Sequence, residues 1–217
     1  MIKKVEAPEW MKEEVMEWLE KGFDSCRNNL TLKWEYDKRR ENYEDLIVCG
    51  NDMLQQFDDT KIVCVLTYSG VDGQRTIALT RSIMEKWNVT EKEIIDQCFD
   101  NVEDEIFHLR PMGEVLTDIT GMNMDEFFVP EEETMYVLTN KSGLNGSRVL
   151  LSGYTQRFLK EKFKKFFIIP SSIHEVLIVA GENKDGEKEH LEELVETVND
   201  TQVEERDRLS YKVAYVA

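Results

Sequence analysis

Residues that can do chemistry cluster within five positions of the chain, at Ser171, Ser172, His174 and Glu175. Nucleophilic catalysis needs a hydroxyl, a base within hydrogen-bond reach and an acid that orients the base. These residue types predict a hydrolase or nucleotide-processing site centred on His174, with Ser172 and Glu175 as the other catalytic candidates. Neighbouring side chains on a strand point to opposite faces, however, so His174 and Glu175 would diverge. The competing interpretation is a turn, in which a serine hydroxyl caps backbone N–H groups after Pro170.

A second hypothesis concerns binding rather than catalysis. It places four polar side chains around one pocket: Asn140, His174, Asn199 and Gln202. Asparagine near the end of a helix or strand commonly tolerates left-handed backbone or satisfies terminal amides and carbonyls. Capping is therefore the alternative role for Asn140 and Asn199.

Patterns for metal or cofactor binding are missing from the sequence. The histidines, at 108, 174 and 190, form no HxH or HExxH pair, and the cysteines, at 26, 49, 64 and 98, lack the close spacing of a zinc knuckle or redox motif. There is no EF-hand loop and no glycine-rich phosphate loop. We expect no cofactor and no structural metal, although carboxylates are plentiful enough for a loose Mg²⁺ or Ca²⁺ contact.

Acidic residues dominate the charge of the chain. Its 217 residues carry 44 acidic and 27 basic side chains, for a net charge of −17. Direct binding to nucleic acid is not expected, because it needs clustered Lys and Arg. The acids concentrate in three windows, Glu91–Glu105, Asp125–Glu133 and Glu182–Asp207. These are either solvated faces or a surface for a basic partner.

Two further features bear on location. The N-terminal residues lack the apolar centre of a signal peptide, and no apolar run approaches the roughly 20 residues of a membrane span. Cys49, Cys64 and Cys98 sit among apolar residues, where a free thiol behaves as a small hydrophobe. We expect a reduced cytoplasmic protein with no membrane contact.

Hydrophobic periodicity predicts the elements that position these residues. Helices are expected at 8–22, 39–56, 81–87, 91–106, 111–120, 155–163 and 187–202, the fourth opened by a capping box from Thr90 to Glu93. Strands are expected at 30–34, 61–68, 75–80, 135–139, 147–152, 166–169, 174–180 and 209–216. The lysines at 160, 162, 164 and 165 form the one basic patch that the sequence shows.

Adjacent pairs of strands imply hairpins and antiparallel pairing. The fold class predicted is therefore α+β: a mostly antiparallel sheet built from hairpins, with amphipathic helices packed on it. A single domain over residues 1–217 is the first interpretation. The alternative is two lobes with a boundary in the acidic loop 121–133.

Several segments together resemble one uncharacterised bacterial (Firmicutes) family, domain-of-unknown-function family 5688. They are Met135–Asn140, Ile168–Val176, Val198–Val203 with Leu209-Ser210, and Leu79–Asn101. The resemblance implies a cytosolic bacterial or mobile-element protein and carries no catalytic residues with it.

Charge and motifs lead to three functional hypotheses. The first is a non-enzymatic protein-interaction module that presents its acidic helices, 91–105 and 187–207, to a basic protein partner. The second, a special case of the first, is a nucleic-acid mimic that inhibits a DNA- or RNA-binding protein and needs its acids on one continuous face. The third is the hydrolase centred on His174.

Overall fold

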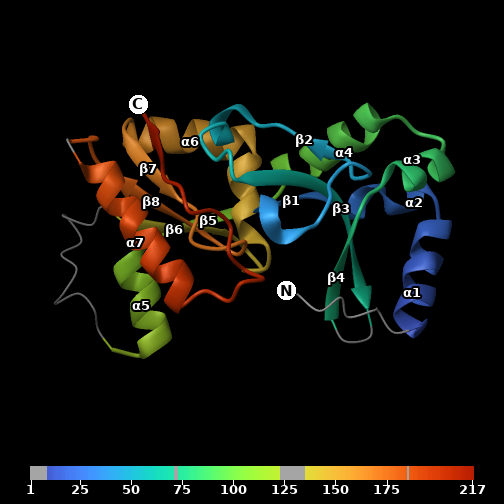
Figure 1. Ribbon diagram of the computed structural model, residues 1–217, viewed down its shortest axis with the longest axis horizontal. Helices are drawn as coiled ribbons and strands as arrows, with labels where there is room; N and C mark the ends of the chain where they lie inside the picture. Colours follow the sequence, from blue (N-terminus) through green and yellow to red (C-terminus); the bar gives the residue numbers. More distant parts are fainter. Residues whose placement is uncertain (1–8, 71–72, 123–134, 185) are drawn as a thin grey trace.

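The computed structural model describes residues 9–70, 73–122, 135–184 and 186–217. Within these ranges the chain forms two antiparallel sheets and the helices that cover them, arranged along one long axis (Figure 1). The α-helices are α1 (Glu9–Glu20), α2 (Phe23–Cys26), α3 (Arg81–Trp87), α4 (Glu91–Glu103), α5 (Met112–Thr120), α6 (Gly153–Phe163) and α7 (Glu187–Thr201). Four 3-10 helices join them: η1 (Arg27–Asn29), η2 (Asp37–Arg39), η3 (Asp52–Leu54) and η4 (Gly146–Leu151).

The first sheet is centred on one long strand. It contains β1 (Leu30–Tyr36), β2 (Val48–Cys49), β3 (Thr60–Gly70) and β4 (Gly73–Ala78). β1 pairs along one edge of β3, whereas β4 and β2 pair with successive parts of the other edge. The β3–β4 hairpin agrees with the sequence prediction for 61–80.

The second sheet has the order β5-β6-β8-β7-β9, and every neighbouring pair in it is antiparallel. Its strands are β5 (Phe107–Pro111), β6 (Met135–Asn140), β7 (Phe166–Ile169), β8 (Val176–Ala180) and β9 (Ala214–Val216). β7 and β8 form a hairpin in which Ile168 faces Ile178. The whole described fold is thus α+β with antiparallel sheets, as the sequence predicts.

Buried apolar side chains connect the two sheets. One cluster contains Leu32 and Leu66 of the first sheet, Cys98 of α4, and Leu138 and Ile178 of the second sheet.

A smaller cluster lies on the opposite face of the second sheet, where Val195 of α7 packs against Phe167, Ile169 and Val213. Alternation along each strand explains both clusters, since successive residues of β7 point to opposite faces.

Two element predictions are wrong. Residues 39–56 are not a helix: Ile47 donates its N–H to Leu79 and accepts from the N–H of Cys64, so this segment is extended beside β3. Residues 147–152 form η4 rather than a strand, with Val149, Leu150 and Leu151 all buried. A short apolar run has no distinctive period when it is buried on all sides, so its helical or extended form depends on the surrounding packing.

Two strands also differ from the prediction. No strand was predicted at residues 107–111, which lie at the junction of two expected helices. Among the described strands β5 is an edge strand that pairs with β6, a position that tolerates Arg110 and the final Pro111. The last strand is shorter than predicted, because only residues 214–216 pair with β7.

The proposed boundary at 121–133 lies outside the described residues from position 123 onward. The strands on either side of that segment, β5 and β6, pair with each other along Phe107–Pro111.

The capping box at the start of α4 provides a test of local stability. Thr90 Oγ1 accepts from the Glu93 N–H at 3.2 Å, and Glu93 Oε2 accepts from the Thr90 N–H at 2.8 Å. We expect Thr90→Ala to lower the free energy of unfolding by about 1 kcal/mol, because the Glu93 N–H loses its acceptor and the Glu93 carboxylate loses the Thr90 hydroxyl that also holds it. Urea denaturation measures this value.

Thr197→Ala is the control, since the Thr197 hydroxyl only returns to the Glu193 carbonyl of its own helix. An equal loss of stability in both variants would contradict the role assigned to the box.

Candidate functional site

Residues 170–175, between β7 and β8, form a tight turn. Ser172 Oγ accepts a hydrogen bond from the backbone N–H of His174 at 3.1 Å, and the Ser172 N–H donates to the Glu175 carbonyl at 3.2 Å. This is the pattern of a serine-capped turn. The hydroxyl of Ser172 is therefore engaged with backbone two residues ahead.

Both ring nitrogens of His174 face protein groups from other segments. Nδ1 accepts from the backbone N–H of Asn145 at 3.2 Å, and Nε2 lies 3.6 Å from Oδ1 of Asp207. The ring links three loops in this way. A catalytic histidine needs one ring nitrogen for its acid and the other for the nucleophile. Here, the second nitrogen is occupied by a backbone amide.

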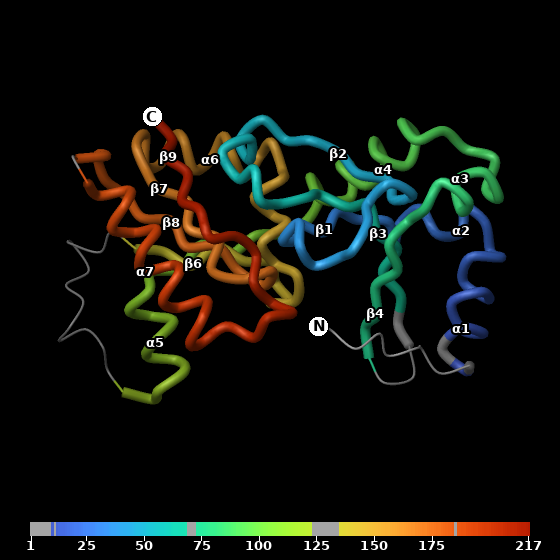
Figure 2. The backbone as a smooth tube through the Cα atoms, in the orientation of Figure 1, coloured from blue at the N-terminus to red at the C-terminus, as the bar shows by residue number. Residues whose placement is uncertain are grey.

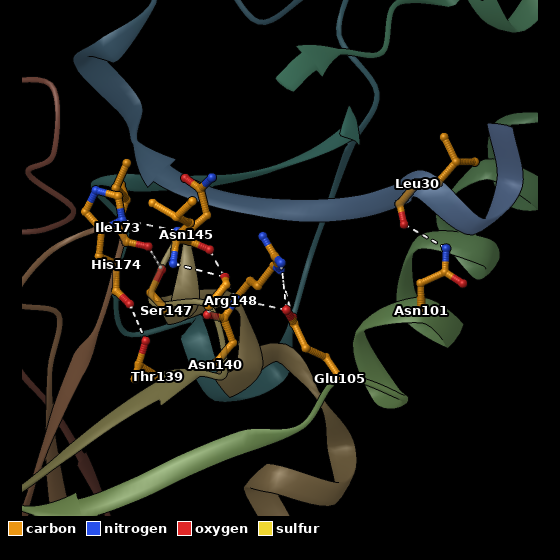
Figure 3. A network of polar contacts seen from close by, with 12 residues as sticks. Leu30, Asn101, Glu105, Thr139, Asn140, Asn145, Ser147, Arg148, Ile173 and His174 are labelled. Carbon is orange, nitrogen blue, oxygen red and sulfur yellow. Dashed lines mark hydrogen bonds and ion pairs between the residues drawn. The ribbon is translucent and has the colours of Figure 1, made fainter. Parts of the chain in front are cut away.

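An ion pair joins the segment after α4 to η4 (Figure 3). Nε and Nη2 of Arg148 donate to the two carboxylate oxygens of Glu105 at 2.7 and 2.6 Å. The buried Asn140 donates to Oε1 of Glu105 at 2.9 Å and to the Leu144 carbonyl at 3.1 Å. A two-point Arg–carboxylate contact is geometrically specific, so it fixes η4 against α4 and β6.

η4 also contacts the His174 turn at very short range. Ser147 Oγ donates to the Ile173 carbonyl at 2.8 Å, and Thr139 Oγ1 donates to the His174 carbonyl at 2.8 Å. Between them lies Gly146, where an added Cβ would collide with Thr139 Oγ1 and the His174 carbonyl oxygen. Asn140 and His174 are thus brought to the same group of loops, which Figure 3 shows from nearby.

Asn199 and Gln202 lie elsewhere, near the end of α7. The buried Asn199 donates to the Ser210 carbonyl at 2.9 Å, and the exposed Gln202 ends the helix with a bond from its N–H to the Val198 carbonyl. In the part of the chain that the structure describes, no hydrogen bond joins either residue to Asn140 or His174. The four predicted binding residues therefore form two separate groups.

A groove along α7 is the most apolar hollow in this region. It has a volume of about 210 Å³. Its apolar lining residues are Met135, Ile169, Leu177, Leu191, Leu194, Val195 and Val198. Leu194 and Val198 remain 48% and 44% exposed, whereas the neighbouring Val195 is buried.

The exposed acidic side chains of α7 lie on a different side of the helix from this apolar surface, and none of them lines the groove. Glu189, Glu193, Glu196 and Asp200 are all exposed on α7. The other acidic helix, α4, lies in the opposite half of the molecule (Figures 1 and 2). The two acidic helices therefore do not adjoin. Of the two, as described at residues 91–103 and 187–201, α7 alone carries large apolar side chains that are about half exposed, and these are Leu194 and Val198.

Neither a metal cluster nor a membrane-spanning helix is found in the described ranges. No group of three or more His, Cys, Asp or Glu residues there has the geometry to hold a metal ion. None of the helices there combines the length and the apolar character that crossing a bilayer requires.

Comparison with known proteins identifies one family. A family model described as a family of unknown function (DUF5688) matches residues 51–216, and the chain belongs to this family. No curated protein and no solved structure matches the chain.

The close contact at Gly146 gives a stability test. We expect Gly146→Ala to lower the free energy of unfolding by about 1–3 kcal/mol, because the backbone of two loops must separate to admit a methyl group. Gly50→Ala is the control, since an added Cβ there meets nothing within 4 Å. Urea denaturation of both variants would show the difference; equal midpoints would contradict the proposed packing.

Glu175 gives a pH-dependent test. Burial raises the pKa of its carboxyl, and nearby His174 opposes this only in part. A raised pKa in the folded state favours folding at low pH, and this contribution is lost as pH rises from the ordinary carboxyl range through the raised value. We therefore expect Glu175→Gln to raise the urea midpoint at pH 7 and to leave it unchanged near pH 4.

Glu161→Gln, on the exposed face of α6, is the matched control and should shift neither midpoint. A Glu175→Gln effect of the same size at both pH values would indicate lost packing rather than relief of a buried charge.

Proposed function

We propose that this protein is a non-enzymatic interaction module of the bacterial cytoplasm, and that the α7 groove binds a basic amphipathic helix of a protein partner. The observation that carries the proposal is the pairing of half-exposed Leu194 and Val198 with the acids of the same helix. The free cysteines support the cytoplasmic setting, because thiols stay reduced there.

The shape of the groove suits a helical occupant. A helix that binds in a groove places apolar anchors at i, i+3, i+4 and i+7 on one face. Leu191, Leu194 and Val198 of α7 have the same spacing, and Leu177 of β8 completes the opposite wall. An approaching helix can therefore align its anchors along α7 and pack against it.

The charge of α7 favours a basic occupant. Glu189, Glu193, Glu196 and Asp200 lie on the other side of α7 from the groove, so they would attract the Lys and Arg of an approaching helix at a distance and would not pair with them inside the groove. Complementary charge raises the association rate and selects the orientation more than it raises affinity. The net charge of −17 acts in the same direction at longer range.

The hydrolase hypothesis receives less support from the geometry. Ser172 bonds backbone, and both His174 ring nitrogens face other protein groups. The mimic hypothesis needs one continuous acidic face, whereas α4 and α7 lie apart (Figure 2). The experiment below distinguishes the mimic hypothesis from binding in the groove.

The test uses a fluorescein-labelled amphipathic helical peptide of Leu and Lys, titrated with the whole protein by fluorescence anisotropy. We expect Leu194→Ala to weaken binding about tenfold, the effect of losing one central anchor. Leu144→Ala is a closely matched control, because Leu144 is 47% exposed against 48% for Leu194. It should leave the dissociation constant unchanged.

Glu193→Gln and Glu196→Gln should slow association at low salt, and Asp100→Asn on α4 should not. If Leu194→Ala and Leu144→Ala bind the peptide with equal affinity, binding in the α7 groove would be contradicted. If removing acids from either helix weakens peptide binding and Leu194→Ala does not, the result would favour the nucleic-acid mimic instead.

A further inference from the structure

A cleft with a cationic lining lies between η2 and the segment that follows α7. These segments, 37–40 and 203–211, run side by side near the middle of the molecule (Figures 1 and 2). The cleft has a volume of about 560 Å³. Its lining residues are Lys38, Arg39, Arg206, Arg208, Tyr36, Tyr211, Glu204 and Glu205. Four cations thus line one cleft in a chain whose net charge is −17.

The sequence gives little sign of this cleft. The cations come from positions more than a hundred and sixty residues apart. Lys38 and Arg39 belong to the basic run 38–40, whereas Arg206 and Arg208 alternate with acids. Tertiary packing brings the two pairs together, and Tyr36 and Tyr211 make contact with ring centroids 5.6 Å apart.

The guanidinium of Arg39 is only loosely paired. Among the described residues its ion pair is with the carboxylate of Glu35, at 3.9 Å, and this carboxylate is also held by Arg40 and Lys33. Nη1 of Arg39 is buried without a hydrogen-bond partner among the described residues. Burial and then the charge of Arg39 lower the pKa of Lys33, which does not line the cleft, whereas the contact with Tyr36 and the nearby acids Asp37 and Asp59 raise the pKa of Lys38.

On the other wall, the two arginines are held at different strengths. Arg208 donates to the Tyr211 hydroxyl at 3.0 Å and to the Val203 carbonyl at 3.2 Å. Arg206 is 75% exposed and pairs with Glu204 at 2.8 Å. Arg208 is therefore fixed, whereas Arg206 and the exposed Lys38 can turn toward an anion.

We propose that this cleft binds a small molecule through its phosphate group. Guanidinium groups match phosphate oxygens with two parallel N–H bonds, and a lysine adds a point charge. The two tyrosine rings offer apolar surface beside the cations, where a planar ring of a nucleotide can pack. This site is independent of the α7 groove, because no residue lines both.

The experiment is calorimetric titration of the whole protein at low ionic strength with three probes: pyrophosphate, adenosine 5′-monophosphate and adenosine. We expect both phosphate probes to bind and adenosine not to bind. If the monophosphate binds more tightly than pyrophosphate, the cleft recognises a nucleotide. If pyrophosphate binds equally well or more tightly, the cleft recognises the phosphate group alone. Failure of both phosphate probes would overturn the proposal, as would equal binding of adenosine.

Paired variants test the location. Lys38→Gln and Arg206→Gln together should weaken binding of the phosphate probes at least tenfold. Lys160→Gln and Arg157→Gln on α6 are the controls, since Lys160 is likewise exposed and Arg157, 67% exposed, also pairs with one glutamate. All four side chains lie at the surface, so thermal melting should be unchanged. Equal weakening in both double variants would show diffuse attraction and overturn the site.

Discussion

The close approach of η4 to the turn between β7 and β8 constrains most of this structure. Gly146 leaves room for the carbonyl of His174 and the hydroxyl of Thr139, and Ser147 bonds the Ile173 carbonyl in the same place. Because η4 also carries Arg148, the ion pair with Glu105 anchors the end of α4 to the second sheet. One contact region thus connects helices of the first half with strands of the second. The polar residues most suggestive of catalysis, His174 and Ser172, belong to this junction, where their bonds go to backbone and to neighbouring loops.

The C-terminal segment depends on a second set of polar contacts. Ser210 and the backbone of Tyr211 bond the carboxylate of Asp59 at 2.6 and 3.0 Å, and Asn199 bonds the Ser210 carbonyl. These bonds fix the chain after α7 against the first sheet. They place Arg206 and Arg208 opposite η2, and they hold α7 over the outer face of the second sheet. Both proposed binding surfaces therefore rely on the same anchoring of residues 199–211.

Charge is distributed to match these two surfaces. Many acids lie on exposed faces of helices, where water and salt screen their mutual repulsion. The cations near η2 have less solvent and share one buried carboxylate, that of Glu35. In the two proposals, a strongly acidic protein would offer the apolar α7 groove to a basic helix and the separate cationic cleft to a phosphate. No side chain lines both surfaces, so the two proposed ligands would not compete for the same side chains.

The sequence determined the elements whose secondary structure depends mainly on residues close to one another in the chain. The Thr90–Glu93 capping box, the β3–β4 hairpin and the alternation of Leu30, Leu32 and Trp34 were predicted correctly, because caps, turns and one-sided burial depend on nearby residues. The amphipathic helix α7 was also predicted. The sequence did not show that Leu194 and Val198 stay about half exposed. How much of an apolar face is covered depends on what packs against it.

Only the tertiary structure decided the rest. Apolar residues in the segment 39–56 have helical spacing, yet the hydrogen bonds of Ile47 to Leu79 and Cys64 hold residues 46–49 extended, because pairing beside β3 outweighs a weak local preference. Residues 147–151 form a buried 3-10 helix because the second sheet and α4 enclose them on every side. The separation of Asn140 and His174 from Asn199, and the meeting of Lys38 with Arg206, likewise follow from long-range packing. Residue types and spacings determined which side chains could bind or react, and the packing of distant segments decided which of them meet.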